Sequence, residues 1–255
     1  MILGVDHLAL SCAALEPAIQ QLTAFGFRLD FAQPDLPNHP GKKPLLKDFQ
    51  PTHGIAYMRA PAGVAIELVN HSAPLTAGRS PYRVLATGPK AVADHGVTPE
   101  DWDGLSAYPT EWAALAVRWW LTPSEEQGTR VKAVSLPVPD LAAATRFWVD
   151  GLGASRRAAT GKGAWVGYRR PVASWSLEVF LQEGPSAGEK PMLDDAGFPC
   201  VALLTNRMDD DLEKATKAGG EVICPPYVVT VNGRPLTVAM LRGPAAEIVE
   251  FIQVK

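Results

Sequence analysis

The 255-residue sequence predicts an α+β fold built from four repeated strand–helix–strand–strand units, and two internal repeats support this prediction. The openings of the units repeat: residues 7–27 align with residues 200–220 without a gap, and a third copy begins near Ala133. The ends of the units repeat as well, since residues 61–69 match residues 244–252. Each copy is predicted to open with a strand, a helix and a glycine that ends the helix.

The helix of each unit is predicted from the spacing of its apolar residues. Leu15, Ile19 and Leu22 stand at i, i+4 and i+7, which is one face of an amphipathic helix. The other copies keep this spacing at Met208, Leu212 and Ala215, and at Leu141, Thr145 and Trp148. Gly26 and Gly219 follow two of the helices, where the chain needs a residue that tolerates a positive φ angle.

The closing strand of each unit carries a carboxylate within an apolar run. Glu67 stands in the first unit, Glu250 at the matching point of the last unit, and Glu178 at a looser match in the third. Side chains alternate across a strand, so each glutamate projects to one face of its sheet. It either faces solvent or, if buried, needs a charged partner or a metal ion, because burying a lone charge is costly.

The second unit is the least regular of the four. Residues 82–87 and 116–120 are its predicted strands, and residues 89–95 are a short predicted helix. Arg118 stands where the other units carry glutamate. Arginine opposes a bound cation and favours an anionic ligand, so this position predicts different chemistry from its counterparts.

Two irregular segments interrupt the repeats. The first covers residues 33–52, where five prolines prevent regular structure, and an insertion of this length indicates a functional lid or a disordered loop. The second, residues 122–128, is polar and rich in turn formers, as linkers are. It predicts an N-terminal domain over residues 1–123 and a C-terminal domain over residues 131–255.

The composition excludes several classes of function. Hydrophobic residues make up 47% of the chain and the net charge is −3, which favours a folded soluble protein without a nucleic-acid surface. Three cysteines are too few for a disulfide framework, and no CxxC pair indicates structural zinc. No signal peptide or membrane span is recognised, so we expect a cytoplasmic protein without a membrane partner.

The repeated unit, with Asp6-His7 in its first strand and an apolar–Glu–apolar closing strand, resembles the vicinal oxygen chelate superfamily. That superfamily includes glyoxalase I, extradiol dioxygenases and the bleomycin-resistance proteins. The resemblance implies βαβββ units that pair into two curved mixed-sheet cups. It also implies a divalent metal, held by the residues at the His7 and Glu67 positions of two paired units. Zn, Mn, Fe or Ni would suit these nitrogen and oxygen donors.

When the His7 and Glu67 positions are compared across the four units, some units lack the implied metal ligands. The first unit keeps His7 and Glu67, and the second has Arg118 at the carboxylate position. The third unit has Ala133 for histidine and keeps Glu178 at a looser match. The fourth unit has Cys200 at the histidine position and Glu250 at the carboxylate position.

Two arrangements of the site remain open. If the first two units share a cup, Arg118 binds a carboxylate or enolate, with His7 and Glu67 as acid/base residues or partial metal ligands. If the first unit pairs with the fourth, His7, Glu67, Cys200 and Glu250 form a four-ligand metal site. The ordinary alternatives are a strand histidine bonded to backbone, solvent-facing glutamates and a buried apolar cysteine.

Two functions follow from the resemblance. The first is a glyoxalase- or dioxygenase-like enzyme that uses a divalent metal on a small oxygen-rich molecule, by isomerase, lyase or dioxygenase chemistry. The alternative is a metal-free protein that binds or sequesters a small molecule or antibiotic, like the bleomycin-resistance proteins. Four units complete two cups within one chain, so a monomer and a homodimer are both compatible with the sequence.

Overall fold

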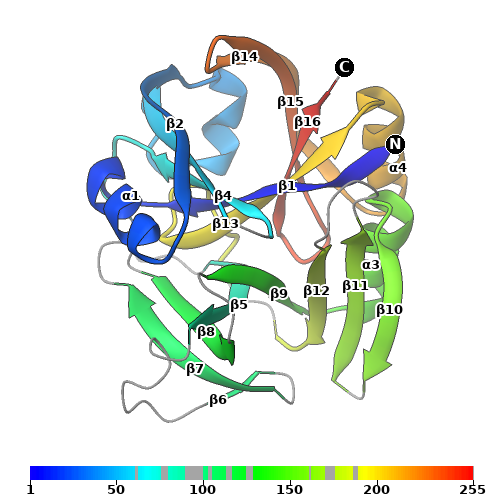
Figure 1. The fold of residues 1–255 in the computed structure, drawn as a ribbon. Coiled ribbons are helices and arrows are strands. Elements are labelled where there is room, and N and C mark those ends of the chain that lie inside the picture. Colours follow the sequence, from blue (N-terminus) through cyan, green and yellow to red (C-terminus); the bar gives the residue numbers. More distant parts are fainter. Residues whose placement is uncertain are drawn as a thin grey trace.

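The computed structural model describes residues 1–60, 63–75, 80–89, 100–102, 105–112, 117–124, 129–160, 162–169, 176–185 and 189–254. It is an α+β fold with two curved eight-stranded mixed sheets, which confirms the predicted fold class. In Figure 1 one sheet occupies the upper half of the view and the other the lower half. No helix among the described residues is long and apolar enough to cross a membrane.

The first sheet combines the first and last units of the chain. Its strands lie in the order β14-β15-β16-β13-β1-β4-β3-β2. They are β1 (Ile2–Ser11), β2 (Arg28–Pro37), β3 (Thr52–Arg59), β4 (Ala65–Asn70), β13 (Gly197–Thr205), β14 (Glu221–Val231), β15 (Arg234–Arg242) and β16 (Ile248–Gln253). β1 and β13 pair antiparallel at the centre, while β4 runs parallel to β1 and β16 parallel to β13. The two units are thus related by an approximate twofold axis between the central strands.

The second sheet combines the two middle units in the same way. Its order is β10-β11-β12-β9-β5-β8-β7-β6. The strands are β5 (Arg83–Pro89), β6 (Glu100–Trp102), β7 (Leu105–Trp112), β8 (Val117–Ser124), β9 (Arg130–Val138), β10 (Ser155–Thr160), β11 (Gly163–Arg169) and β12 (Ser176–Glu183). β5 and β9 pair antiparallel at its centre. The short helix predicted over residues 89–95 lies outside the described residues.

The pairing of units corrects the predicted division into residues 1–123 and 131–255. The two sheets are not the two halves of the chain, because each sheet takes one unit from each half. The first strand of each unit has a free edge with which the first strand of any other unit can pair. The sequence pattern within a unit does not specify which unit that partner is. Consecutive units two and three pair with each other, and the first unit pairs with the fourth.

The helices follow the predicted amphipathic pattern. α1 (Leu15–Ala24) buries Leu22, with Leu15 and Ile19 partly buried against the core, and α4 (Met208–Lys217) buries its apolar face. The third unit has a short helix, α3 (Leu141–Arg146), continued by a π-helical turn, η3 (Phe147–Gly151). Gly26 and Gly219 have φ angles of 89° and 103°, which confirms their predicted role after the helices.

One apolar core lies between the two sheets. It includes residues of β1 and β16 from the first sheet and residues of β9 and β12 from the second. A buried polar contact also crosses this interface, since the Trp148 indole N–H donates a hydrogen bond to Glu247 Oε1 at 3.1 Å. The sheets therefore form a single packed body.

Candidate active site in the first sheet

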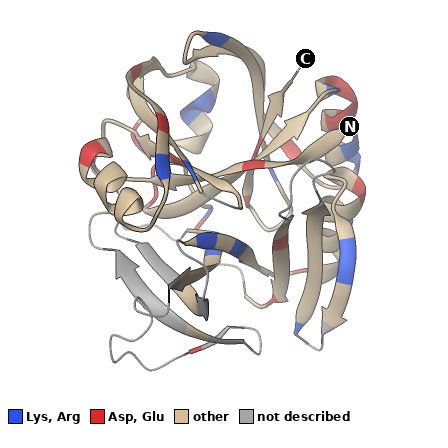
Figure 2. Ribbon diagram, viewed as in Figure 1, with Lys and Arg blue, Asp and Glu red and all other residues tan. Residues whose placement is uncertain are grey.

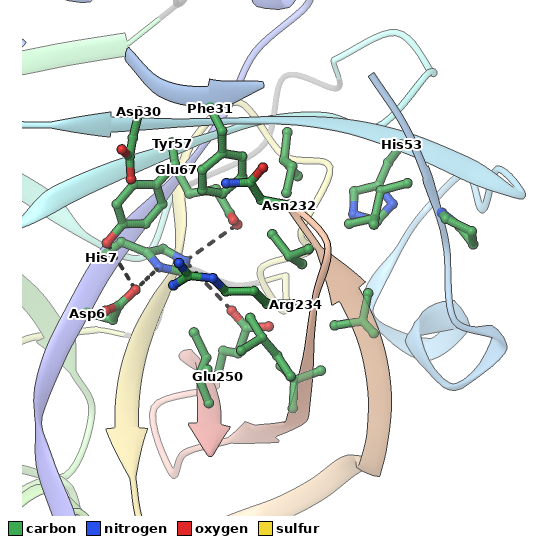
Figure 3. A pocket seen from close by; sticks show the side chains of 18 of the residues that line it. Asp6, His7, Asp30, Phe31, His53, Tyr57, Glu67, Asn232, Arg234 and Glu250 are labelled. Atoms are coloured by element: carbon green, nitrogen blue, oxygen red, sulfur yellow. Dashed lines mark hydrogen bonds and ion pairs between the residues drawn. The ribbon is translucent and has the colours of Figure 1, made fainter. Parts of the chain in front are cut away.

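The concave side of the first sheet, here called the cup, holds a cavity of about 410 Å³ (Figure 3). Strands of the first and fourth units supply most of its wall. A 3₁₀ helix in the proline-rich segment, η1 (Pro40–Leu45), supplies Lys42. The polar residues that line the cavity are Asp6, His7, Asp30, Lys42, His53, Tyr57, Arg59, Glu67, Tyr227, Asn232, Arg234 and Glu250.

His7 is fixed at the base of the cup by its neighbours on β1 and β3. It is 2% exposed, and Asp6 Oδ2 lies 3.0 Å from its Nδ1. The Tyr57 hydroxyl donates to the same Asp6 oxygen at 3.1 Å, and its ring meets His7 edge-on. The Asp6 carboxylate accepts a hydrogen bond from Nδ1–H, so the ring directs Nε2 into the cup, where it has no hydrogen-bond partner among the described residues.

Glu67 and Glu250 reach the same point from opposite units. Glu67 lies opposite Ala9 in the β1–β4 ladder, and Glu250 lies opposite Ala202 in the β13–β16 ladder, so the two glutamates are equivalent under the approximate twofold. Their Oε2 atoms lie 3.5 Å and 3.7 Å from His7 Nε2. The structure therefore brings His7, Glu67 and Glu250 together, with one ligand atom of each within 4.8 Å of the others.

The electrostatics of this trio favour a positive charge between the side chains. Burial lowers the pKa of His7, but Glu67 and Asp6 more than offset it and hold that pKa well above 6.5. Burial raises the pKa of Glu250, while Lys42 lowers it. The same arrangement of carboxylates that attracts a proton to His7 also attracts a metal cation.

The donor geometry fits a divalent transition metal. Ligand atoms about 2.1 Å from a tetrahedral or octahedral ion lie about 3.0–3.4 Å from one another, close to the separations from Nε2 to the two carboxylates. The Asp6–His7 contact also has the form of the outer carboxylate that orients a metal-binding histidine. His7, Glu67 and Glu250 are therefore the residues that would hold the ion.

Cys200 lies near this trio but outside it. Its side chain is buried, and it lines a second cavity of about 40 Å³ that Glu67 and Glu250 also line. Burial raises the pKa of its thiol well above the ordinary value, so the thiolate form that binds metals is disfavoured. Of the four predicted ligands, the structure brings three into one cluster and leaves Cys200 beside it.

Arg118 and Glu178 belong to the second sheet. Arg118 lies on β8, so it does not share a cup with His7 and Glu67, which corrects the arrangement that joined the first two units. Its side chain lies outside the described residues. Glu178 stands opposite Ala133 and lies 3.7 Å from the Arg157 guanidinium nitrogen Nε.

Lys42 is a site residue that the sequence did not predict. Burial lowers its pKa, but Tyr227, Glu250 and Glu67 together raise that pKa above the ordinary value, so the side chain is a cation. Figure 2 shows basic residues on η1, beside the cup. The proline content indicated that this segment was functional or disordered, but no spacing rule indicated which of its side chains enters the site.

The proline-rich segment is an ordered part of the cup. The Leu45 carbonyl accepts a hydrogen bond from Leu193 N–H at 2.8 Å, and the Asp194 carboxylate accepts from the backbone N–H groups of Lys47 and Asp48. The Lys47 ammonium lies 2.6 Å from Asp195 Oδ1. These contacts attach the segment of the first unit to the loop before β13.

Comparison with known proteins agrees with this architecture. Residues 130–235 match the family model of the Glyoxalase/Bleomycin resistance protein/Dioxygenase superfamily. Glyoxalase I from Zea mays has the same fold, with a TM-score of 0.66 and 16% identity over 98% of this chain and 92% of that chain. A dioxygenase candidate from Bacillus subtilis has a TM-score of 0.62 and 13% identity, over 99% of this chain and 85% of that chain. The sequence has no match among curated proteins.

These findings confirm the resemblance to the vicinal oxygen chelate superfamily. The chain has the fold of glyoxalase I over nearly its whole length, and its middle part matches the superfamily model. The matched segment does not include His7, Glu67 or Glu250. Any role for these three residues therefore depends on the geometry of the cup.

Proposed function

We propose that the protein is a metal-dependent enzyme of the glyoxalase/dioxygenase type that acts on a small oxygen-rich molecule in the first cup. The observation that supports this proposal is the convergence of His7, Glu67 and Glu250 on one point of a cavity of about 410 Å³. A cavity of this size is in the range of small-molecule sites. Both halves of the site come from one chain, so a monomer is sufficient for activity.

The residues of the cup have distinct roles in this proposal. His7, oriented by Asp6, would bind a divalent ion through Nε2, and Glu67 and Glu250 would supply oxygen ligands. When bound, such an ion is a Lewis acid that polarises a substrate oxygen, which serves isomerase, lyase and dioxygenase reactions alike. Apolar side chains of the wall, among them Ile55, would exclude water and orient the rest of the substrate.

The metal content of the purified protein tests the proposal. We expect about one divalent ion per chain after purification without chelator, and loss of most of it in His7→Ala, Glu67→Gln and Glu250→Gln, because each removes one of three donors. Glu178→Gln is the matched control, since Glu178 occupies the corresponding closing strand of the third unit. Elemental analysis measures all four variants. Substoichiometric metal that His7→Ala leaves unchanged would contradict the proposal.

A second candidate is a metal-free protein that binds a small molecule or antibiotic. The observation that favours it is Lys42, whose ammonium lies in the same cup as the two glutamates and offsets part of their charge. A cup whose charges are balanced by its own side chains can hold a ligand by hydrogen bonds and apolar contacts alone. The same elemental analysis separates the two candidates.

A further inference from the structure

Lys42 lies where two cavities meet. It lines the main cavity of the cup and also the smaller cavity of about 40 Å³ behind it, and Glu67 and Glu250 line both as well. The lysine comes from η1, outside the repeated units, so it has no counterpart under the approximate twofold. This position puts an ammonium group beside the two carboxylates.

The segment that carries Lys42 is held firmly over the cup. On its N-terminal side the His39 ring stacks on Tyr227, with centroids 4.1 Å apart and an interplanar angle of 12°. On its C-terminal side the backbone of Lys47 and Asp48 is bonded to the buried Asp194. Lys42 is therefore positioned from both directions, as a residue that contacts a ligand must be.

Two histidines near Lys42 are neutral, and one of the two arginines that line the main cavity is paired. Burial, followed by repulsion from Lys42, lowers the pKa of His53 to about 3 and that of His71 to about 4, so both imidazoles are uncharged at neutral pH. Arg59, at the cavity wall, donates two hydrogen bonds to Asp30. Arg234 also lines the main cavity, but of the described lysine and arginine residues that line it, Lys42 alone lines the smaller cavity as well.

The charge balance of the cup changes when a divalent ion is added. Without the ion, the carboxylates of Glu67 and Glu250 attract the Lys42 ammonium. With the ion, the carboxylates become its ligands and attract Lys42 less strongly, while the Tyr227 hydroxyl remains beside the ammonium. A partly buried charge that has lost part of its attraction to opposite charges is costly, so the cup with a bound ion favours an anionic group beside Lys42.

From this arrangement, we infer that Lys42 binds an anionic oxygen of the ligand, a carboxylate or an enolate, next to the metal held by His7, Glu67 and Glu250. This inference rests on the proposed function and narrows its substrate class to small acids or molecules that form enolates. It assigns to Lys42 the anion-binding role that the sequence suggested for Arg118.

The test uses Co²⁺ as the metal and oxalate, a small dianion with vicinal oxygens, as the ligand probe. Lys42→Met removes the charge at similar length, and Lys42→Arg retains a charge. Lys43→Met is the matched control, because Lys43 is the exposed neighbour on η1 and lies 5.2 Å from the Phe49 ring centroid. Competition with a chromophoric chelator measures Co²⁺ affinity, and the visible absorption of bound Co²⁺ follows the oxalate titration.

We expect Lys42→Met to weaken oxalate binding about ten- to hundredfold, because it removes one close opposite charge, and to leave Co²⁺ binding as tight as or tighter than in the wild type. Lys42→Arg should retain most of the oxalate affinity, and Lys43→Met should match the wild type in both measurements. Normal oxalate binding by Co²⁺-loaded Lys42→Met would overturn the inference alone. Failure of the wild type to bind Co²⁺ would instead overturn the proposed function.

Discussion

At the scale of single residues, the orientation of His7 is the feature that makes the cup a metal-site candidate. A histidine within an apolar strand has two nitrogens and many ordinary uses, and the sequence alone does not tell which nitrogen enters a cavity. Asp6, its neighbour in sequence, engages Nδ1 and leaves Nε2 for the cup, while Tyr57 holds Asp6 in place. The Asp-His pair was visible in the sequence, but the contribution of Tyr57 required the β3–β4–β1 arrangement.

The Asp6 contact predicts a measurable effect on metal affinity. Asp6→Asn weakens the outer interaction without removing a metal ligand, and we expect about ten- to hundredfold weaker binding of Zn²⁺. Asp30→Asn is the control, because Asp30 lines the same cavity but pairs with Arg59 rather than with His7. Chelator competition measures both variants. Equal losses in the two variants would mean that general charge, and not the orientation of His7, governs affinity.

At the scale of elements, periodicity predicted the helices of the first and fourth units because the contacts that form a helix are local. The apolar spacing in α1 and α4 and the positive-φ glycines after them follow directly from helix geometry. The proline-rich segment has no such period. Its position over the cup is set by contacts with residues about 150 positions away, such as those of Asp194, and these leave no local pattern.

Asp194 should therefore control the order of the proline-rich segment. Asp194→Ala leaves two backbone N–H groups without their acceptor, and we expect a loss of about 1–3 kcal/mol in the free energy of unfolding. We also expect faster hydrogen exchange in residues 40–49. Urea denaturation and exchange mass spectrometry measure the two effects, with the exposed Asp35→Ala as control. Unchanged exchange in Asp194→Ala would show that other contacts hold the segment.

At the scale of the whole molecule, the two sheets share one core, and the buried Glu247 lies at their junction. Its carboxylate accepts hydrogen bonds from the Trp148 indole N–H of the third unit and from Ala245 N–H. Burial nevertheless raises the pKa of Glu247 from 4.5 to about 7. The protonated side chain is thus the form that the folded protein favours at mildly acidic pH.

This shift predicts a pH dependence of stability. The contribution of Glu247 is fully present below pH 4.5 and is lost as the pH rises to about 7, because the folded state must then ionise a buried acid. The loss amounts to about 3 kcal/mol in the free energy of unfolding. Glu247→Gln should lack this dependence, whereas the exposed Glu16→Gln should follow the wild type. Urea titrations at pH 5, 6 and 7.5 measure the difference, and parallel profiles for wild type and Glu247→Gln would refute it.

The pairing of units is the part of the whole fold that the sequence left open. Four similar units can pair in more than one way, and each way satisfies the same strand patterns. The arrangement that joins the first and fourth units brings Glu67 and Glu250 together, and it moves Arg118 to the other sheet. Which units pair depends on how side chains pack between the two sheets. That packing combines residues from all parts of the chain, so no local sequence pattern predicts it.

The antiparallel pairing of β1 with β13 also has a consequence for biosynthesis. Ala9 lies opposite Cys200, about 190 positions later, so a nascent chain leaving the ribosome carries β1 for most of translation with its hydrogen-bonding edge still uncovered. The middle sheet, whose central strands lie much closer in sequence, can assemble before that edge is covered. Slow maturation and a dependence on chaperones are the risks that this connectivity brings to the cell.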